Sequence, residues 1–273
     1  MNTSAGLDSD TGEESETGSA SLGGNDPPQT PSAPGGKPFL PDPLGPRREQ
    51  SRLVVAVDGP SGAGKSSASR GAAIALGLRY LDTGSMYRAL TWWLLEQGVD
   101  TNDAGAVGAL AAEPIIEVGT DPRAPWVRVN GTDVSAAIRT QEVTSAVSAV
   151  ARVPRVRAHL IAQQRDIIAN ARGIVAEGRD IGTVVAPDAP VKVFLTADSA
   201  ARADRRAAET SWSAASTQVD QDRRDRLDAA QSAKAGDAVE IDSTRLDLDQ
   251  VIDTIVRLAR ERADVPYPHQ QTR

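Results

Sequence analysis

A glycine-rich segment contains Gly59, Gly64, Lys65 and Ser66 at the spacing G-x-x-x-x-G-K-[ST], which is typical of loops that hold phosphate groups. Glycines allow successive backbone N–H groups to turn towards phosphate oxygens, and the start of a helix adds partial positive charge. Lys65 is expected to neutralise a transferred phosphate, and Ser66 to ligate Mg²⁺. The alternative is a strand-to-helix turn that binds no ligand. The residues expected to bind the nucleotide are Gly59, Pro60, Ser61, Gly62, Ala63, Gly64, Lys65, Ser66 and Ser67.

This loop indicates nucleotide binding but leaves the reaction open, so other segments must distinguish the classes of nucleotide-binding protein. A GTPase would recognise guanine through an N-K-x-D-like segment, and no lysine of the chain lies in such a context. An ATPase would place paired acidic residues at the end of an apolar strand. Here the strand predicted at Ile174–Ala176 is followed by Glu177, Gly178, Arg179 and Asp180. This arrangement favours a site built around the phosphate of an acceptor molecule.

Four arginines could neutralise that acceptor phosphate. Arg88 lies about one turn inside a helix predicted to begin near Thr83, at the carboxyl end of a strand. Arg139, Arg157 and Arg179 lie in or beside predicted turns. A nucleoside monophosphate needs such positive charge before it can approach ATP. Each arginine alone is typical of a solvated surface, but together they outnumber what loops need for solubility.

These residues are separated by short apolar segments that alternate with helical ones, which is the pattern of βαβ units in a parallel sheet. The chain is 40% hydrophobic but only 3% aromatic, so its core must consist mostly of Val, Leu, Ile and Ala. We therefore predict an α/β fold, in which helices flank a five-stranded parallel sheet. The predicted strands are Leu53–Val57, Arg79–Leu81, Ile174–Ala176, Val191–Leu195 and Ala238–Ile241.

Two excursions interrupt this alternation. Trp126–Val129 and Thr132–Val134 flank an Asn-Gly pair, which predicts a hairpin with a type I′ turn in a small antiparallel insert at about 105–137. An Arg- and Asp-rich stretch at about 205–236 has no strand pattern and is predicted to form a helical lid. The helical segment Asp249–Ala263 is expected to close the fold.

Composition limits the cellular setting. Residues 1–50 are mainly Ser, Gly, Pro, Thr, Asp and Glu, which predicts a disordered acidic tail before a catalytic domain at 51–265 and a polar tail at 266–273. The net charge of −7 argues against general nucleic-acid binding, and no apolar run approaches the roughly 20 residues that span a bilayer. The absence of cysteine fits a reducing cytoplasm. We expect a cytoplasmic monomer that binds neither nucleic acid nor membrane.

Five motifs, in order along the chain, resemble those of bacterial cytidylate kinases. The Glu-Gly-Arg-Asp-Ile-Gly-Thr stretch that begins at Glu177 is distinctive among nucleoside monophosphate kinases. The resemblance covers about residues 52–263 and implies that ATP phosphorylates CMP or dCMP, giving ADP and CDP or dCDP. The motifs are Asp58–Lys65, Leu81–Gly84, Ile138–Val143, Pro154–Arg157 and Glu177–Val185.

The resemblance also implies which residues recognise the acceptor nucleoside. Ser148, Arg157 and Asp180 would recognise the base, and Thr83 and Asp225 would contact the ribose. The chemistry is consistent, because a carboxylate and a hydroxyl suit the exocyclic amine of cytosine while a guanidinium suits its O2 atom.

Phosphate and metal roles follow in the same way. The resemblance places the acceptor phosphate on Arg88 and Arg179, which with Lys65 form the expected catalytic set. Glu177 could hold Mg²⁺ together with Ser66, or it could remain a hydrogen-bonded carboxylate at a strand end. No side-chain nucleophile is required, because positioning and charge stabilisation carry phosphoryl transfer.

The resemblance weakens in the lid. Family members usually continue with Asp-Ser-x-Arg and Ser-Pro-Leu, whereas here Asp228 follows Leu227 and Gln231 stands for an expected arginine. Neighbouring arginines could compensate or could pair with aspartates on one helix face; they are Arg223, Arg224 and Arg226, with Asp220, Asp222 and Asp225. Two alternatives therefore stay open: a kinase for another small acceptor, such as UMP or a shikimate-like alcohol, and a nucleotide sensor with poor turnover.

Overall fold

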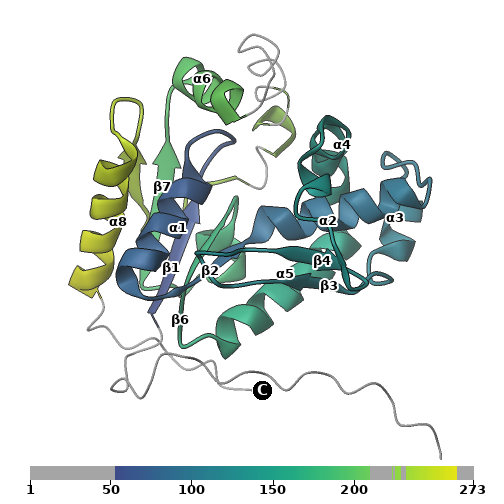
Figure 1. The fold of residues 1–273 in the computed structure, drawn as a ribbon, viewed down its shortest axis with the longest axis horizontal. Coiled ribbons are helices and arrows are strands. Elements are labelled where there is room, and N and C mark those ends of the chain that lie inside the picture. Colours follow the sequence, from purple (N-terminus) through teal and green to yellow (C-terminus); the bar gives the residue numbers. More distant parts are fainter. Residues whose placement is uncertain (1–52, 210–222, 224, 229–231, 263–273) are drawn as a thin grey trace, which may run out of the picture. The chain divides into compact units, whose positions relative to one another are not determined.

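The computed structural model describes residues 53–209, 223, 225–228 and 232–262, and the tails predicted at 1–50 and 266–273 lie outside these ranges. Within them the main sheet has five parallel strands in the order β2-β6-β1-β7-β8 (Figure 1). All five predicted strands are confirmed, with small shifts at their ends. The strands are β1 (Leu53–Asp58), β2 (Arg79–Asp82), β6 (Gly173–Gly178), β7 (Val191–Thr196) and β8 (Val239–Asp242).

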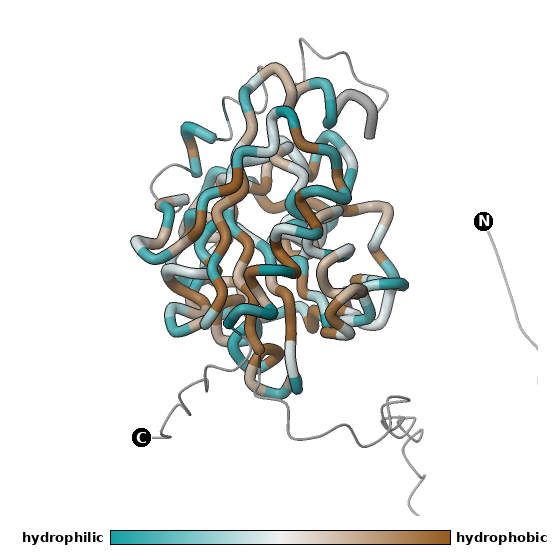
Figure 2. The backbone as a smooth tube through the Cα atoms, turned by 90° about the vertical axis from the view of Figure 1, so that its left-hand side faces the viewer, coloured by the Kyte–Doolittle hydropathy of each residue, from teal (hydrophilic) through white to brown (hydrophobic). Residues whose placement is uncertain are grey.

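Strand β1 lies at the centre of the sheet, paired in parallel with β6 on one side and β7 on the other. Its residues from Val54 to Val57 are buried, and successive side chains point to opposite faces of the sheet. Val54 and Ala56 belong to one hydrophobic cluster, whereas Val55 and Val57 belong to another. Helices therefore cover both faces, which explains why the strand is continuously apolar. In Figure 2 the interior strands accordingly carry long hydrophobic stretches.

Two helices cover one face of the sheet. They are α1 (Lys65–Leu76) and α8 (Leu248–Arg262), which lie side by side at the left of Figure 1. They approach so closely that a Cβ built at Gly71 would lie 2.2 Å from Cδ1 of Ile252. The helix predicted at the end of the fold is thus confirmed as α8. It packs against α1, the helix that follows the phosphate loop.

The other face carries the helices that surround the predicted acceptor site. The side chain of Asp82 caps the first of them by accepting a hydrogen bond from Ser85 N at 2.9 Å. Trp92 and Trp93, on the same helix, pack against the core in partly buried positions. These helices are α2 (Thr83–Glu96), α3 (Ala104–Leu110), α4 (Gln141–Ala151) and α5 (Pro154–Asn170).

The predicted antiparallel insert is present and packs against α2. Its loop residues Asn130 and Gly131 have φ values of 49° and 79°, which confirms the type I′ turn. Val127 and Val129 are buried in the same hydrophobic cluster as Val54, so the insert extends the core of the main sheet. Its strands are β3 (Ile116–Val118), β4 (Val127–Val129) and β5 (Thr132–Asp133).

The lid predicted at 205–236 is described only in part. The helix α6 (Ser199–Glu209) leads into it, residues 225–228 are helical, and residues 232–235 have no regular structure. Arg224 and Gln231, which the sequence singled out, lie outside the described residues. None of the helices in the described ranges is long and apolar enough to cross a membrane.

Candidate active site

The phosphate loop joins the end of β1 to the start of α1, where helix N–H groups have no partner within the helix. Three of its glycines have positive φ values: 150° at Gly59, 77° at Gly62 and 87° at Gly64. A Cβ at Gly59 would lie 2.1 Å from the carbonyl oxygen of Leu195, so no side chain fits there. Lys65 Nζ donates a hydrogen bond to the carbonyl oxygen of Pro60 at 2.8 Å, which places the ammonium group beside the loop.

Asp58, the residue before the loop, connects it to the turn that carries the predicted acceptor residues. Its carboxylate is only 4% exposed and accepts hydrogen bonds from Ile181 N and Gly182 N, both at 2.7 Å. Burial raises the pKa of Asp58 to about 6, although the two backbone hydrogen bonds oppose the shift. Because Arg179 and Asp180 directly precede these N–H groups, Asp58 fixes them relative to the loop.

Glu177 lies buried at the carboxyl end of β6, next to the loop. The Tyr80 hydroxyl donates a hydrogen bond to its Oε1 atom. Burial raises the pKa of Glu177 to about 7, and the negative charge of Asp82 adds to this effect. The ammonium group of Lys65 and hydrogen bonds from Tyr80 and Ser66 favour the ionised form and oppose the shift. The expected metal ligands Ser66 and Glu177 are therefore neighbours.

The chemistry of this neighbourhood fits Mg²⁺. Glu177, Asp82 and Ser66 present oxygen atoms, which this cation prefers, and a divalent charge would relieve the repulsion between the two carboxylates. Within the described residues, no group of three or more His, Cys, Asp or Glu side chains could hold a metal. A cation here would accordingly share its coordination with phosphate oxygens and water, as is usual for Mg²⁺.

Arg88 points from α2 towards the start of α4. Its NH1 group donates to Thr144 Oγ1 at 2.9 Å and to the carbonyl oxygen of Ile138 at 3.3 Å. Arg139 follows Ile138 and is exposed. The structure thus brings these two predicted phosphate ligands to the same end of α4.

Arg179 lies between two carboxylates of the lid segment. It donates a hydrogen bond to Asp225 at 3.2 Å and forms an ion pair with Asp228 at 2.9 Å. Asp225 also accepts from Ser61 N of the phosphate loop at 3.3 Å and pairs with Arg202. Burial alone would raise the pKa of Asp225, but the two guanidinium groups outweigh it and lower the pKa. The predicted ribose ligand Asp225 is therefore placed beside the phosphate loop.

The predicted base-recognition residues come from three elements: the turn after β6, α5 and α4. Asp180 is 6% exposed, and its Oδ2 atom accepts a hydrogen bond from Arg157 of α5. Ser148 of α4 is buried, and its hydroxyl has no partner among the described residues. The Thr83 hydroxyl donates to the carbonyl oxygen of Glu177 at 2.7 Å, so it ties α2 to the end of β6.

Sequence reasoning missed four residues that build this site: Asp58, Arg202, Arg205 and Asp228. The guanidinium of Arg205 donates to two oxygens of Ser243, to Oγ at 2.9 Å and to the backbone carbonyl oxygen at 2.6 Å. Its NH1 atom lies 3.9 Å from a Cβ built at Gly64. The arginines belong to a stretch with so many Arg and Asp residues that no single one stands out. Asp58 had a usable signal, because a carboxylate at the end of an apolar strand must find donors when it is buried.

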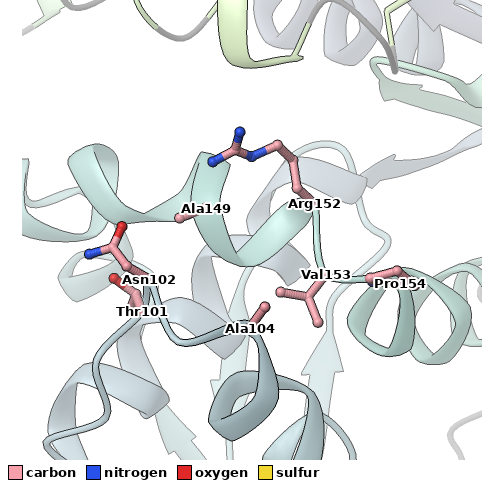
Figure 3. Close-up of a pocket in the computed structure, with 7 residues that line it drawn as sticks. All are labelled: Thr101, Asn102, Ala104, Ala149, Arg152, Val153 and Pro154. Carbon is pink, nitrogen blue, oxygen red and sulfur yellow. The ribbon is translucent and has the colours of Figure 1, made fainter.

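A separate hollow of about 260 Å³ lies between the starts of α3 and α5 and the end of α4 (Figure 3). No predicted site residue lines it. Figure 3 shows the guanidinium of Arg152 directed away from the other lining side chains. The residues around it are Thr101, Asn102, Ala104, Ala149, Arg152, Val153 and Pro154.

A glycine-rich phosphate loop at the carboxyl edge of a five-stranded parallel sheet, facing arginines on a second set of elements, defines the class of P-loop kinases. The family model for cytidylate kinase matches residues 55–261. Because that match covers most of the sequence, the chain belongs to the cytidylate kinase family.

Named relatives agree with this assignment. The chain is 51% identical over 224 residues to a cytidylate kinase from Streptomyces avermitilis, covering 80% of this chain and 97% of the relative. It is 54% identical over 215 residues to a cytidylate kinase from Streptomyces griseus, covering 77% and 93%. Among solved structures, a gluconokinase from Sinorhizobium meliloti 1021 aligns with a TM-score of 0.44 at 15% identity, over 79% of this chain and 95% of that one.

Proposed function

We propose that this chain transfers the γ-phosphoryl group of ATP to CMP or dCMP, giving ADP and CDP or dCDP, as a step of pyrimidine nucleotide metabolism. The observation that carries the proposal is the bridge from Asp58 to Ile181 and Gly182. It holds the phosphate loop next to the turn with Arg179 and Asp180, which supports donor and acceptor sites that meet at one edge of the sheet.

The acceptor phosphate and the transferred phosphoryl group would lie among fixed positive charges. Lys65 neutralises the transferred group from the loop side, while Arg179 and Arg88 approach from β6 and α2. Bound Mg²⁺ would add charge neutralisation on the phosphates, held by Ser66 and Glu177. The protein needs no nucleophile of its own, because the acceptor phosphate oxygen attacks the γ-phosphorus directly.

Base choice would rest on the Arg157–Asp180 pair, in which the carboxylate is buried and the guanidinium is partly buried. A buried carboxylate strongly favours a partner that donates, such as the exocyclic amine of cytosine, over one that presents another acceptor. Arg157 and Ser148 would serve the neighbouring polar atoms of the base. We further propose that the protein is a monomer that works in the cytoplasm and binds neither nucleic acid nor membrane.

The test is a panel of acceptors with MgATP, in which ADP release is followed by a coupled assay for CMP, dCMP, UMP and shikimate. We expect CMP and dCMP to give the highest kcat/KM, and product analysis to show the nucleoside diphosphate. Removal of Mg²⁺ with EDTA should stop turnover, and added Mg²⁺ should restore it. Preferred turnover of shikimate or UMP would contradict the proposed acceptor, and binding without product would support a nucleotide sensor instead.

A further inference from the structure

Two buried polar groups near the base-recognition pair have no hydrogen-bond partner among the described residues. They are the Tyr87 hydroxyl on α2 and the Gln164 side-chain nitrogen on α5. Gln164 is 1% exposed, so water cannot readily satisfy it. Native proteins leave few such groups unsatisfied, and those that remain call for an explanation.

Their position suggests one. Gln164 lies seven residues after Arg157 on α5, which puts both side chains on the same face, two helical turns apart. Helix α2, which carries Tyr87, packs against that helix. The Tyr87 hydroxyl lies near enough to Arg157 and Asp180 for both charges to influence its pKa, and it neighbours the Gln164 side-chain amide. Three elements therefore bring Gln164, Tyr87 and Asp180 together in one buried region.

The donor and acceptor properties of these groups give the arrangement a direction. The amide nitrogen of Gln164 can only donate, so a hydrogen bond between the two groups would run from Gln164 to the Tyr87 oxygen and leave the hydroxyl hydrogen for another acceptor. Burial raises the pKa of Tyr87 to about 12, so the hydroxyl keeps its proton at neutral pH. Asp180 is the neighbouring acceptor: Arg157 engages Oδ2, and a carboxylate has a second oxygen that can accept another hydrogen bond.

We propose that Gln164 and Tyr87 are positioning residues that fix the Asp180 carboxylate for the acceptor base. Gln164 donates to the Tyr87 oxygen, and the Tyr87 hydroxyl donates to Asp180 when the acceptor binds and draws on the Arg157–Asp180 pair. The carboxylate then keeps its orientation while it accepts from the exocyclic amine. This inference rests on the proposed function and adds two residues to its base-recognition site.

The test combines two variants and their double mutant. Tyr87→Phe removes the hydroxyl but keeps the ring, and it should raise KM for CMP by about 5- to 50-fold while KM for ATP stays within about twofold. It should also reduce the preference for CMP over UMP, because Asp180 loses its orientation. Gln164→Met, of similar shape, should change both quantities in the same direction but less. Because Gln164 acts only through the hydroxyl, the double variant should match Tyr87→Phe alone.

Gln163→Met is the matched control. Gln163 is the neighbouring residue on α5, and its side-chain oxygen is also buried without a partner among the described residues. Its replacement should leave KM for CMP and the CMP preference unchanged. Urea unfolding of every variant checks that the fold is retained.

The outcomes separate this inference from the function on which it rests. If Tyr87→Phe retains the wild-type KM for CMP and the wild-type CMP preference, or if the two substitutions act additively, the positioning role is wrong and the proposed function stands. If the wild-type protein does not phosphorylate CMP, the proposed function is wrong and the inference falls with it.

Discussion

Arg179 forms an ion pair with Asp228, in which NH2 lies 2.9 Å from Oδ2 and the two side chains are 20% and 11% exposed. The guanidinium that is proposed to hold the acceptor phosphate is thus already engaged by a lid carboxylate. An incoming phosphate must compete with this carboxylate for the same N–H groups. The pair therefore weakens the binding of the acceptor phosphate, and a neutral residue at position 228 would reduce this effect.

Replacement of Asp228 by Asn should consequently strengthen acceptor binding. We expect KM for CMP to fall by about 2- to 10-fold, since the competing charge is lost but a hydrogen-bonding side chain remains. Steady-state kinetics at several ionic strengths would measure it. Asp237→Asn serves as control, because Asp237 pairs with Lys192 instead. A raised KM for CMP would show that Asp228 orients Arg179 productively.

Lys65→Ala should abolish product formation and leave the fold intact. The ammonium group lies beside the phosphate loop and packs no part of the core, so its loss removes charge stabilisation from the transferred group. We expect kcat to fall by about 100-fold or more, with an unchanged circular dichroism spectrum. Lys234→Ala, which removes an exposed lysine paired with Glu240, is the control. Near-normal turnover of the Lys65 variant would overturn the assignment of the loop.

The buried carboxylate of Asp58 predicts a pH dependence of stability. Its pKa is about 6 in the folded protein against an ordinary value of 3.8, so the folded state binds the proton more tightly than the unfolded state does. The contribution of Asp58 to the free energy of unfolding is therefore full below about pH 4 and is lost as the pH rises through 6. A shift of this size corresponds to about 3 kcal/mol.

Comparison with Asp58→Asn isolates this effect, because other titrating groups are shared. The stability of wild type relative to the variant, from urea unfolding, should decline by about 2 to 3 kcal/mol between pH 4 and pH 7. The variant should also be less active at every pH, since one amide oxygen cannot accept from Ile181 and Gly182 as a carboxylate does. A constant stability difference across this range would show that Asp58 titrates normally.

The sequence was sufficient for features that depend on local patterns. The five strands follow from apolar segments, and the hairpin turn follows from Asn130-Gly131, whose residues tolerate positive φ. The bridge from Asp58 to Gly182 could not be predicted in this way, because it depends on β6 pairing beside β1 across 124 residues of sequence. The position of Asp225 beside Ser61 likewise depends on a contact between residues 164 positions apart, and the sequence around Asp225 has no strand pattern to guide a prediction.

Base choice provides the most specific test of the acceptor site. If Asp180 accepts from the cytosine amine, UMP would place a carbonyl oxygen against the buried carboxylate, and both acceptors would lack a donor. We expect kcat/KM for UMP to be about 5- to 150-fold lower than for CMP. In Asp180→Asn the amide can turn either its NH₂ group or its oxygen towards the base. The variant should therefore lose efficiency with CMP and discriminate less between the two nucleotides.

The measurement is kcat/KM for CMP and UMP in wild type, in Asp180→Asn and in Asp188→Asn. Asp188 is an exposed aspartate a few residues further along the chain, so its replacement changes the net charge equally without altering the buried pair. If Asp180→Asn keeps the full preference for CMP, Asp180 does not recognise the base. Its role would then be to hold Arg157 in place, and loss of that ion pair should lower the stability of the variant while base choice stays unchanged.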